Sequence, residues 1–260
     1  MNKHLNLLYF SATGTTGQVV QAVAEGINVN VTENNITLPD KRKRDLVFDE
    51  NDLVIIGVPV HGGRVPALLT DYFSGVKGDK TAAVFIVVYG NRNYDDALLE
   101  LKDIFEGNGF IGIAGGAFIG EHPFTDRVGT GKPDQKDLAI ARRFGAEIKE
   151  KLLKNKNLSN MSELLVKGNR PYKERKPMGL LPETNERCIS CGECARICPV
   201  GAIDFNDYSN VDAARCISCF SCIKKCPEGA KSMNPEILGK IAQRLIDNFG
   251  TVKNEPELYI

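Results

Sequence analysis

The chain has 260 residues, of which 42% are hydrophobic and 25% are charged, and its 33 basic side chains equal its 33 acidic ones in number. This composition is globular, and the zero net charge removes any bulk electrostatic reason to bind nucleic acid or a membrane surface. The apolar run at the start of the chain is too short for a signal peptide or a membrane span, so we expect a cytoplasmic protein.

The first part of the chain alternates apolar runs with amphipathic segments, which is typical of a parallel sheet covered by helices on both faces. Strands are expected at 4–10, 35–38, 52–58, 81–89 and 110–119, and helices near 15–27, 66–74, 94–107 and 134–155. The strand at 35–38 has the weakest pattern. The predicted fold class is α/β, with a doubly wound parallel five-stranded sheet of order 2-1-3-4-5 whose ligand crevice lies at the carboxyl ends of the strands.

A loop rich in hydroxyl groups joins the first predicted strand to the first predicted helix. It consists of Ser11, Ala12, Thr13, Gly14, Thr15 and Thr16. Backbone N–H groups and hydroxyls at a helix N-terminus form an anion site, so the loop predicts phosphate binding, with ordinary helix capping as the alternative. The loop is not a Walker loop, because no lysine follows a glycine at the required spacing, and it lacks the G-x-G-x-x-G dinucleotide pattern.

Two further loops follow the next two strong strands. The first contains Pro59, Val60, His61, Gly62 and Gly63, and the second contains Tyr89, Gly90, Asn91, Arg92 and Tyr94. Because the carboxyl ends of parallel strands meet at one edge of a sheet, all three loops are expected to converge there. This convergence favours ligand binding over capping alone.

The first loop resembles the phosphate loop T/S-x-T-G-x-T of flavodoxins, and residues 90–94 resemble the flavodoxin loop whose tyrosine stacks on the flavin ring. The resemblance implies FMN, with its phosphate in loop 11–16 and its isoalloxazine between loops 59–64 and 89–95. It places Tyr94 in the stacking position.

Two further features of the sequence affect the expected flavin site: the residues beside Tyr94 and the lack of an aromatic residue in the loop 59–63. Asn91 and Arg92 would lie near the ring or ribityl edge, where a positive charge favours anionic reduced flavin. The chain has no tryptophan and carries His61-Gly62-Gly63 where many flavodoxins place an aromatic residue. Three consequences stay open: an exposed ring face, looser FMN binding, or cover supplied by a neighbouring subunit.

All eight cysteines lie in two runs of the form C-x2-C-x2-C-x3-C-P, and the flanking residues 187–202 and 215–230 repeat as well. Disulfides are not expected without an oxidising compartment, which leaves metal ligation. The runs resemble those of bacterial ferredoxins, in which the fourth cysteine of each run ligates the other cluster. The resemblance implies two [4Fe–4S] clusters, one held by Cys188, Cys191, Cys194 and Cys226 and the other by Cys216, Cys219, Cys222 and Cys198. Two structural zinc sites are the alternative.

The cysteine distribution divides the chain into four expected parts. They are a flavodoxin-like domain at 1–155, a linker at 156–182, a small α+β 2[4Fe–4S] ferredoxin-like domain at 183–234, and a C-terminal helix and tail at 235–260. The linker is long enough to wrap along the first domain and to set the distance between clusters and flavin. The basic run 41–44 is either a docking site for an acidic partner or a solvated loop. His122 is either a proton relay to the flavin or an ordinary loop histidine.

Taken together, the motifs resemble the flavodoxin–ferredoxin fusion proteins of anaerobes. This resemblance implies an electron-transfer protein that exchanges single electrons between two [4Fe–4S] clusters and FMN and shuttles them between oxidoreductases. One alternative is an FMN-dependent reductase of a small molecule such as a flavin, quinone or nitro compound. A second is a flavin-free redox sensor or scaffold. Redox proteins are the expected partners, and neither nucleic acid nor a membrane is.

Overall fold

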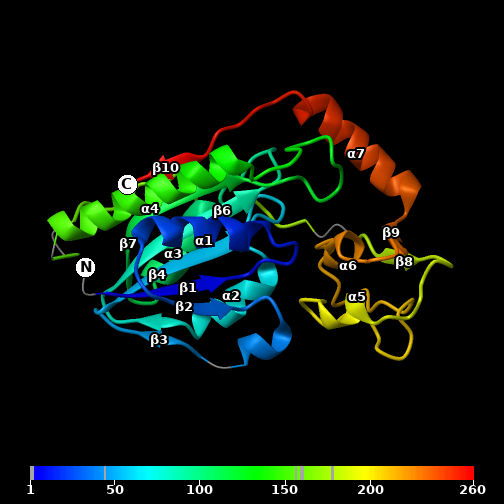
Figure 1. Cartoon of the computed structure of the whole chain (residues 1–260), viewed down its shortest axis with the longest axis horizontal. Coiled ribbons are helices and arrows are strands. Elements are labelled where there is room, and N and C mark those ends of the chain that lie inside the picture. The colour runs from blue at the N-terminus through cyan, green and yellow to red at the C-terminus, as the bar shows by residue number, and fades with distance from the viewer. Residues whose placement is uncertain (1–2, 44, 156, 159–160, 177–178) are drawn as a thin grey trace.

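The structure is a computed structural model that describes residues 3–43, 45–155, 157–158, 161–176 and 179–260. The sheet and its helices form one end of the molecule, and the cysteine-rich segment forms the other (Figure 1). Helix α7 leads from the cysteine-rich segment back toward the sheet (Figure 1). The two parts are therefore linked twice along the chain.

The central sheet has six strands in the order β10-β7-β6-β4-β1-β2. They are β1 (His4–Tyr9), β2 (Val31–Asn35), β4 (Asp52–Pro59), β6 (Thr81–Tyr89), β7 (Phe110–Ile119) and β10 (Glu257–Tyr259). The first five are parallel, so the predicted doubly wound order 2-1-3-4-5 is confirmed. The prediction of five strands was incomplete, because β10 pairs antiparallel with β7 at the sheet edge.

The second strand lies earlier in the chain than the sequence pattern indicated. It covers Val31–Asn35, not 35–38, and it is mostly exposed because it is the sheet's edge strand. The apolar Ile36 that favoured the later position is 2% exposed and packs into the core directly after the strand. Two short strands, β3 (Val47–Phe48) and β5 (Lys77–Gly78), pair in a separate small sheet.

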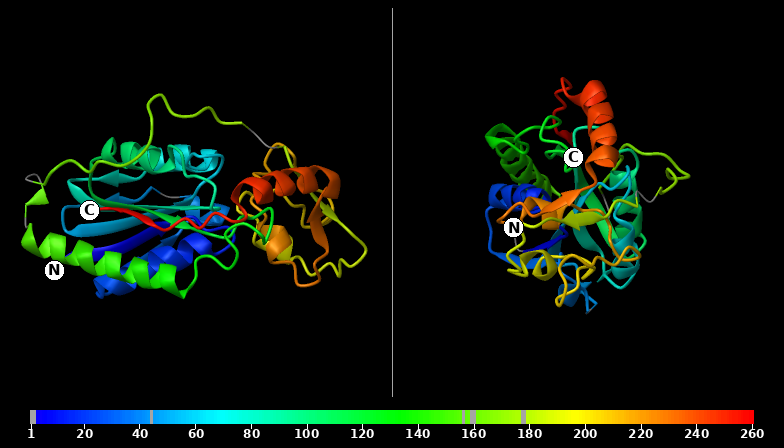
Figure 2. Two further views of the ribbon diagram at one scale, coloured as in Figure 1. Left: turned by 90° about the horizontal axis from the view of Figure 1, so that it is seen from above. Right: turned by 90° about the vertical axis from the view of Figure 1, so that its right-hand side faces the viewer.

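Helices cover both faces of the sheet, as predicted (Figure 2). Helices α1 (Thr15–Ile27) and α4 (Gln135–Lys154) pack on one face, and α2 (Ala67–Ser74) and α3 (Ala97–Glu106) pack on the other. A short 3₁₀ helix, η1, covers Pro39–Arg42. The strands between them are buried on both sides, which explains their continuous apolar runs.

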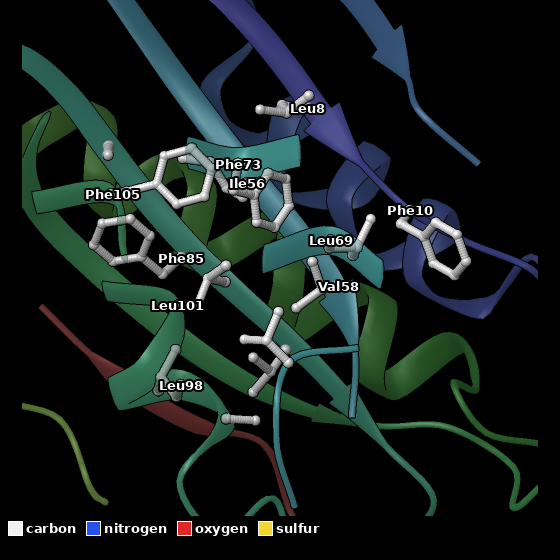
Figure 3. Close-up of a cluster of buried hydrophobic side chains, with 14 of the residues drawn as sticks. Leu8, Phe10, Ile56, Val58, Leu69, Phe73, Phe85, Leu98, Leu101 and Phe105 are labelled. Atoms are coloured by element: carbon white, nitrogen blue, oxygen red, sulfur yellow. The ribbon is translucent and has the colours of Figure 1, made fainter. Parts of the chain in front are cut away.

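The face under α2 and α3 has an aromatic core (Figure 3). The ring of Phe105 lies 4.9 Å from that of Phe73 and 6.2 Å from that of Phe85, measured between centroids. All three side chains are fully buried. This apolar cluster, which we call the α2–α3 core, extends to Phe10 and Ala12 at the end of β1.

The cysteine-rich segment is built from two similar halves. Each half contains one short helix, α5 (Glu193–Arg196) or α6 (Ser221–Lys224). Strands β8 (Pro182–Thr184) and β9 (Lys231–Met233) pair antiparallel beside them. An isolated bridge joins Ile203 to Val211.

The described residues between 157 and 176 run along the outer side of α3 (Figure 2). Leu164 is buried against the α2–α3 core. The backbone N–H groups of Asn169 and Lys173 donate to the two carboxylate oxygens of Asp96, at 2.8 and 2.6 Å. Arg170 donates to Asp103 through two nitrogens. This segment is therefore fastened to the sheet domain by specific contacts.

The C-terminal region differs from the expectation of a helix with a simple tail. Helix α7 (Pro235–Phe249) has no buried residue, and its side chains Leu238 and Ile241 contact a small apolar cluster in the cysteine-rich segment. The chain then returns to form β10 at the sheet edge, where it covers the open hydrogen-bonding groups of β7. None of the described helices is long and apolar enough to cross a membrane.

Candidate cofactor sites

The hydroxyl-rich loop between β1 and α1 is shaped for an anion. Gly14 is the N-cap of α1 with φ +101°, and no side chain caps the helix. A Cβ atom at this position would meet nothing within 4 Å, so the backbone faces open space. In the described part of the chain, the N–H groups of Thr15 and Thr16 donate to no oxygen. These free donors, with the hydroxyls of Thr13 and Thr15 3.5 Å apart, suit a phosphate group.

The loop after β4 is a tight hairpin that packs on the loop after β6. His61 and Arg64 exchange two backbone hydrogen bonds across Gly62 and Gly63. Both glycines have positive φ, which a two-residue turn of this kind requires. A Cβ atom on Gly63 would lie 2.1 Å from the Asp95 carboxylate, so only glycine permits this approach. The two loops therefore converge at the carboxyl end of the sheet.

The loop after β6 is held by the C-terminal tail. The side-chain amide of Asn91 donates to the Val252 carbonyl at 2.8 Å, and that of Asn254 donates to the Asn91 carbonyl at 3.0 Å. Asn91 is 3% exposed, and Arg92 pairs with Asp95 at 2.5 Å. The polar groups expected near a flavin edge are thus engaged with protein groups.

Tyr94 does not lie where the sequence resemblance put it. Its side chain is 3% exposed and belongs to the α2–α3 core, with its ring 5.5 Å from that of Tyr89. Its hydroxyl bonds to the Tyr259 hydroxyl at 2.7 Å and donates to Glu257 at 2.9 Å, both in β10. Because β10 and the core enclose the ring, Tyr94 cannot stack on a flavin in this conformation. The sequence did not indicate that the tail would bind here.

Two histidines lie at the same end of the sheet. The ring of His122 packs against Gly90, where an added Cβ atom would lie 2.7 Å from His122 Cδ2, and its centroid is 4.9 Å from that of Phe124. Burial lowers the pKa of His122 to about 4, and the positive charges of Arg92 and Lys224 act in the same direction. Burial also lowers the pKa of His61 to about 4. Both imidazoles are therefore neutral at pH 7.

The eight cysteines line two separate cavities. One is lined by Cys188, Cys191, Cys194 and Cys226, and the other by Cys198, Cys216, Cys219 and Cys222. In each case three thiols come from one run and the fourth from the other run. This is the grouping that the ferredoxin resemblance implies.

Backbone N–H groups point at the sulfur atoms in both halves. The N–H of Ala202 donates to Cys198 Sγ and that of Ala230 donates to Cys226 Sγ, each at 3.2 Å. Such bonds stabilise thiolate ligands and tune cluster potential. Burial raises the pKa of Cys219 to about 11 and that of Cys222 to about 12. Burial thus favours the protonated thiols, and a bound metal cation would stabilise the thiolate forms.

The two cavities differ in their position relative to the sheet domain. In the cavity containing Cys219, this residue and Ile217 pack against the α2–α3 core. In the other cavity, Cys191 is exposed to solvent and Ile189 is 64% exposed. We call the site of Cys198, Cys216, Cys219 and Cys222 the inner site and the site of Cys188, Cys191, Cys194 and Cys226 the outer site. The sequence repeat is nearly symmetric, so it could not reveal this order.

Part of the basic run 41–44 has a structural role that the sequence did not suggest. Arg42 donates to the carbonyls of Ile36, Thr37 and Pro199. It thereby joins the sheet domain to the residue that follows Cys198. Residue 44 lies outside the described residues.

One family model matches part of the cysteine-rich segment. Residues 187–230 match the family described as 4Fe-4S dicluster domain. A comparison with curated proteins found no match. Two [4Fe–4S] clusters are thus the cofactors of the cysteine-rich segment, and the chain has a redox role in electron transfer.

Several solved flavodoxin structures are similar to the sheet domain. A flavodoxin from the domain Archaea has 17% identity and a TM-score of 0.42, covering 58% of this chain and 99% of its own. Oxidised flavodoxin 1 from Bacillus cereus has 14% identity and a TM-score of 0.42, covering 57% and 98%. A Streptococcus pneumonia flavodoxin has 14% identity and a TM-score of 0.42, covering 56% and 98%. The flavodoxin-like assignment depends on the strand order described above.

Proposed function

We propose that this protein is an electron carrier in which two [4Fe–4S] clusters exchange single electrons with FMN bound at the carboxyl end of the sheet. The observation that carries the proposal is the contact between the two sites. The hydroxyl of Ser221, next to the inner-site ligand Cys222, donates to the Ala12 carbonyl in the hydroxyl-rich loop at 2.8 Å, and the contact is buried. A cluster and a flavin bound to these residues would lie in adjacent parts of one structure.

The residues present fit the phosphate end of FMN. The free N–H groups of Thr15 and Thr16 and the hydroxyls of Thr13 and Thr15 would bind the phosphate, and the N-terminal end of α1 favours its negative charge. Ser11 would act indirectly, because its Oγ accepts from the Gly17 N–H and so holds the first turn of the helix. Tyr94 is not part of the proposed site, since β10 covers it.

The ring end of the site would be bordered by the hairpin 61–64 and the loop 89–92. The imidazoles of His61 and His122 are neutral there, so they can accept or donate a hydrogen bond without adding charge. The N–H of Phe124 donates to His122 Nδ1 at 3.3 Å, which leaves Nε2 as the proton-bearing nitrogen.

Bound FMN can accept or donate one or two electrons, whereas each cluster carries one electron, so FMN would link one-electron transfer to two-electron transfer. The protein's own part is to fix positions and exclude water. The tail residues 252–259 hold the loop after β6, and the segment 169–175 holds the loop after β4. These contacts fix the loops at the carboxyl end of the sheet. Fixed loops suit a carrier that must not rearrange between electron transfers.

The direct test is cofactor analysis of protein purified without oxygen. We expect about eight irons, eight sulfides and one FMN per chain. Thr15→Val removes a proposed phosphate ligand and is expected to weaken FMN binding by about tenfold, which corresponds to about 1.4 kcal/mol. Thr32→Val, in the exposed edge strand β2, is the matched control and should not change the affinity. Eight irons with no flavin, even after FMN is added, would contradict the proposal and leave residues 1–155 as a scaffold.

A further inference from the structure

The two cysteine runs differ at one position that has structural consequences. Between the second and third cysteines the outer run has Gly192 and the inner run has Phe220. Both residues are the N-cap of a short helix and both have positive φ, 75° for Gly192 and 64° for Phe220. Glycine adopts this conformation freely, but a bulky aromatic residue there is strained. Contacts elsewhere must therefore hold Phe220 in place.

Those contacts lead from the inner site to the sheet domain. Phe220 is 3% exposed, and its ring centroid lies 4.8 Å from that of Phe124, with 31° between the ring planes. Phe124 in turn contacts His122, which packs on Gly90 in the loop after β6. A row of three rings thus connects a residue between two inner-site ligands to the predicted flavin loop.

The neighbours of Phe220 make polar contacts with the same part of the sheet domain. Ser221, which is 1% exposed, donates to the Ala12 carbonyl. Lys224 pairs with Glu121 at 2.6 Å, and both side chains are about one-third exposed or less. In the outer half, the residue equivalent to Ser221 is Glu193, which among the described residues forms its ion pair with Arg196 in its own helix. At these positions the inner half therefore makes contacts with the sheet domain that the equivalent residue of the outer half does not make.

We infer that the inner cluster is the direct electron partner of the flavin, and that Phe220 and Ser221 are the positioning residues that hold it there. Held by its four cysteines, the outer cluster would take one electron from a separate low-potential one-electron donor protein. It would be reoxidised by reducing the inner cluster by one electron, and the inner cluster would be reoxidised by passing that electron to FMN. This inference rests on the proposed function, because it requires bound FMN.

The physical reason is the steep fall of electron-transfer rate with distance between redox centres. Cys219 and Ile217 of the inner site touch the core that contains Ala12, whereas Cys191 of the outer site is exposed to solvent. The inner site is therefore the one with a ligand that packs against the core of the sheet domain. The aromatic row and the Ser221 contact keep the distance from the inner site to the sheet domain short and constant.

Two variants and a matched control test the inference. Phe220→Gly introduces the residue that the outer run uses, so it relieves the backbone and removes only the ring contacts. Ser221→Ala removes the hydroxyl contact with Ala12. Glu193→Ala is the control, because it changes the equivalent position of the outer half, where the side chain pairs with Arg196 of its own short helix. Cluster absorption and electron paramagnetic resonance spectra verify that every variant keeps both clusters.

The first readout is hydrogen exchange of the hydrogen-bonded amides of Ser11, Gly17 and residues 223–225, which requires no flavin. We expect exchange at least about tenfold faster in both docking variants, equal to about 1.4 kcal/mol of lost docking, and no change in the control. The second readout is the rate at which FMN is reduced after flash reduction of the clusters. We expect this rate to fall at least about tenfold in Phe220→Gly, in which the cluster moves away from the flavin.

The outcomes separate this inference from the proposed function. If wild-type protein binds no FMN, the proposed function fails and this inference fails with it. If wild-type protein binds FMN, but exchange and transfer rates in Phe220→Gly and Ser221→Ala match those of Glu193→Ala, only the inference is overturned. The inference is supported if exchange is faster in both docking variants and flavin reduction is slower in Phe220→Gly, while Glu193→Ala behaves as wild type.

Discussion

Glu100 is the charge that holds the loop after β4 and the segment beyond α4 to the sheet domain. It is 3% exposed on α3 and accepts hydrogen bonds from Arg64 Nε at 2.7 Å, from Arg64 Nη2 at 2.8 Å and from the Val65 N–H at 2.9 Å. A further bond comes from Arg175 at 2.6 Å. Two cations and a backbone donor thus depend on one buried carboxylate.

The substitution Glu100→Gln removes this charge with little change in shape. Removing one partner of a buried ion pair costs about 3–5 kcal/mol. Here one oxygen remains as an acceptor and Arg175 is partly exposed, with 34% of its side chain accessible, so we expect the lower end, about 3 kcal/mol. The hydrogen bond to Glu100 raises the pKa of Arg64, so this guanidinium stays charged and cannot relieve the loss by releasing a proton.

Urea unfolding followed by far-ultraviolet circular dichroism measures this change. We expect a lower midpoint with an unchanged denaturant slope, because the surface buried on folding stays the same. The control is Glu150→Gln, which removes an exposed pair with Lys154 at 3.7 Å and should cost no more than about 0.5 kcal/mol. A loss below about 1 kcal/mol in Glu100→Gln would show that the buried carboxylate is not the anchor described here.

Two further predictions concern the tail and His122. Deleting residues 251–260 removes the partners of Asn91 and Tyr94, so we expect amide exchange in residues 90–95 to increase at least about tenfold; exchange within twofold of the intact chain would contradict a fastening role for the tail. The pKa of His122 is lowered in the folded protein to about 4, so the unfolded chain binds a proton first as pH falls below its ordinary value of about 6.5. Stability should therefore be complete above pH 6.5 and decrease toward pH 4 by at most about 1.4 kcal/mol per pH unit. In His122→Gln this pH-dependent part of the stability should be absent from urea unfolding curves measured between about pH 4 and 6.5. An unchanged pH dependence in the variant would refute the lowered pKa of His122.

Elements whose sequence pattern depends only on nearby residues were predictable from the sequence. Strands β4 and β6 are apolar at nearly every position because both faces are covered, and that pattern needs no knowledge of distant partners. The N-cap of helix α4 is Asp134, whose side chain accepts from the Lys136 and Asp137 N–H groups, and this capping pattern is local in the sequence. The cysteine spacing is also local, because three thiols in one short loop form most of a site.

Elements that depend on a distant partner were not predictable. Strand β2 is polar and exposed, so the apolar residue after it gave a stronger signal than the strand itself. Strand β10 has three residues and exists only because the edge of β7 is free to pair with it. Tyr94 has the motif position of a flavin partner, but its environment is set by residues more than 160 positions later in the chain.

The sequence by itself therefore determined the α/β class, the parallel sheet order, the positions of the three loops and the two cysteine runs. Each of these follows from periodicity or spacing within a few tens of residues. Only the tertiary structure decided which cysteine site faces the sheet domain, that the tail closes over the loop after β6, and that Phe220 replaces a glycine to make a contact. These features arise from packing between distant segments, and a nearly symmetric repeat contains no signal that distinguishes its inner half from its outer half.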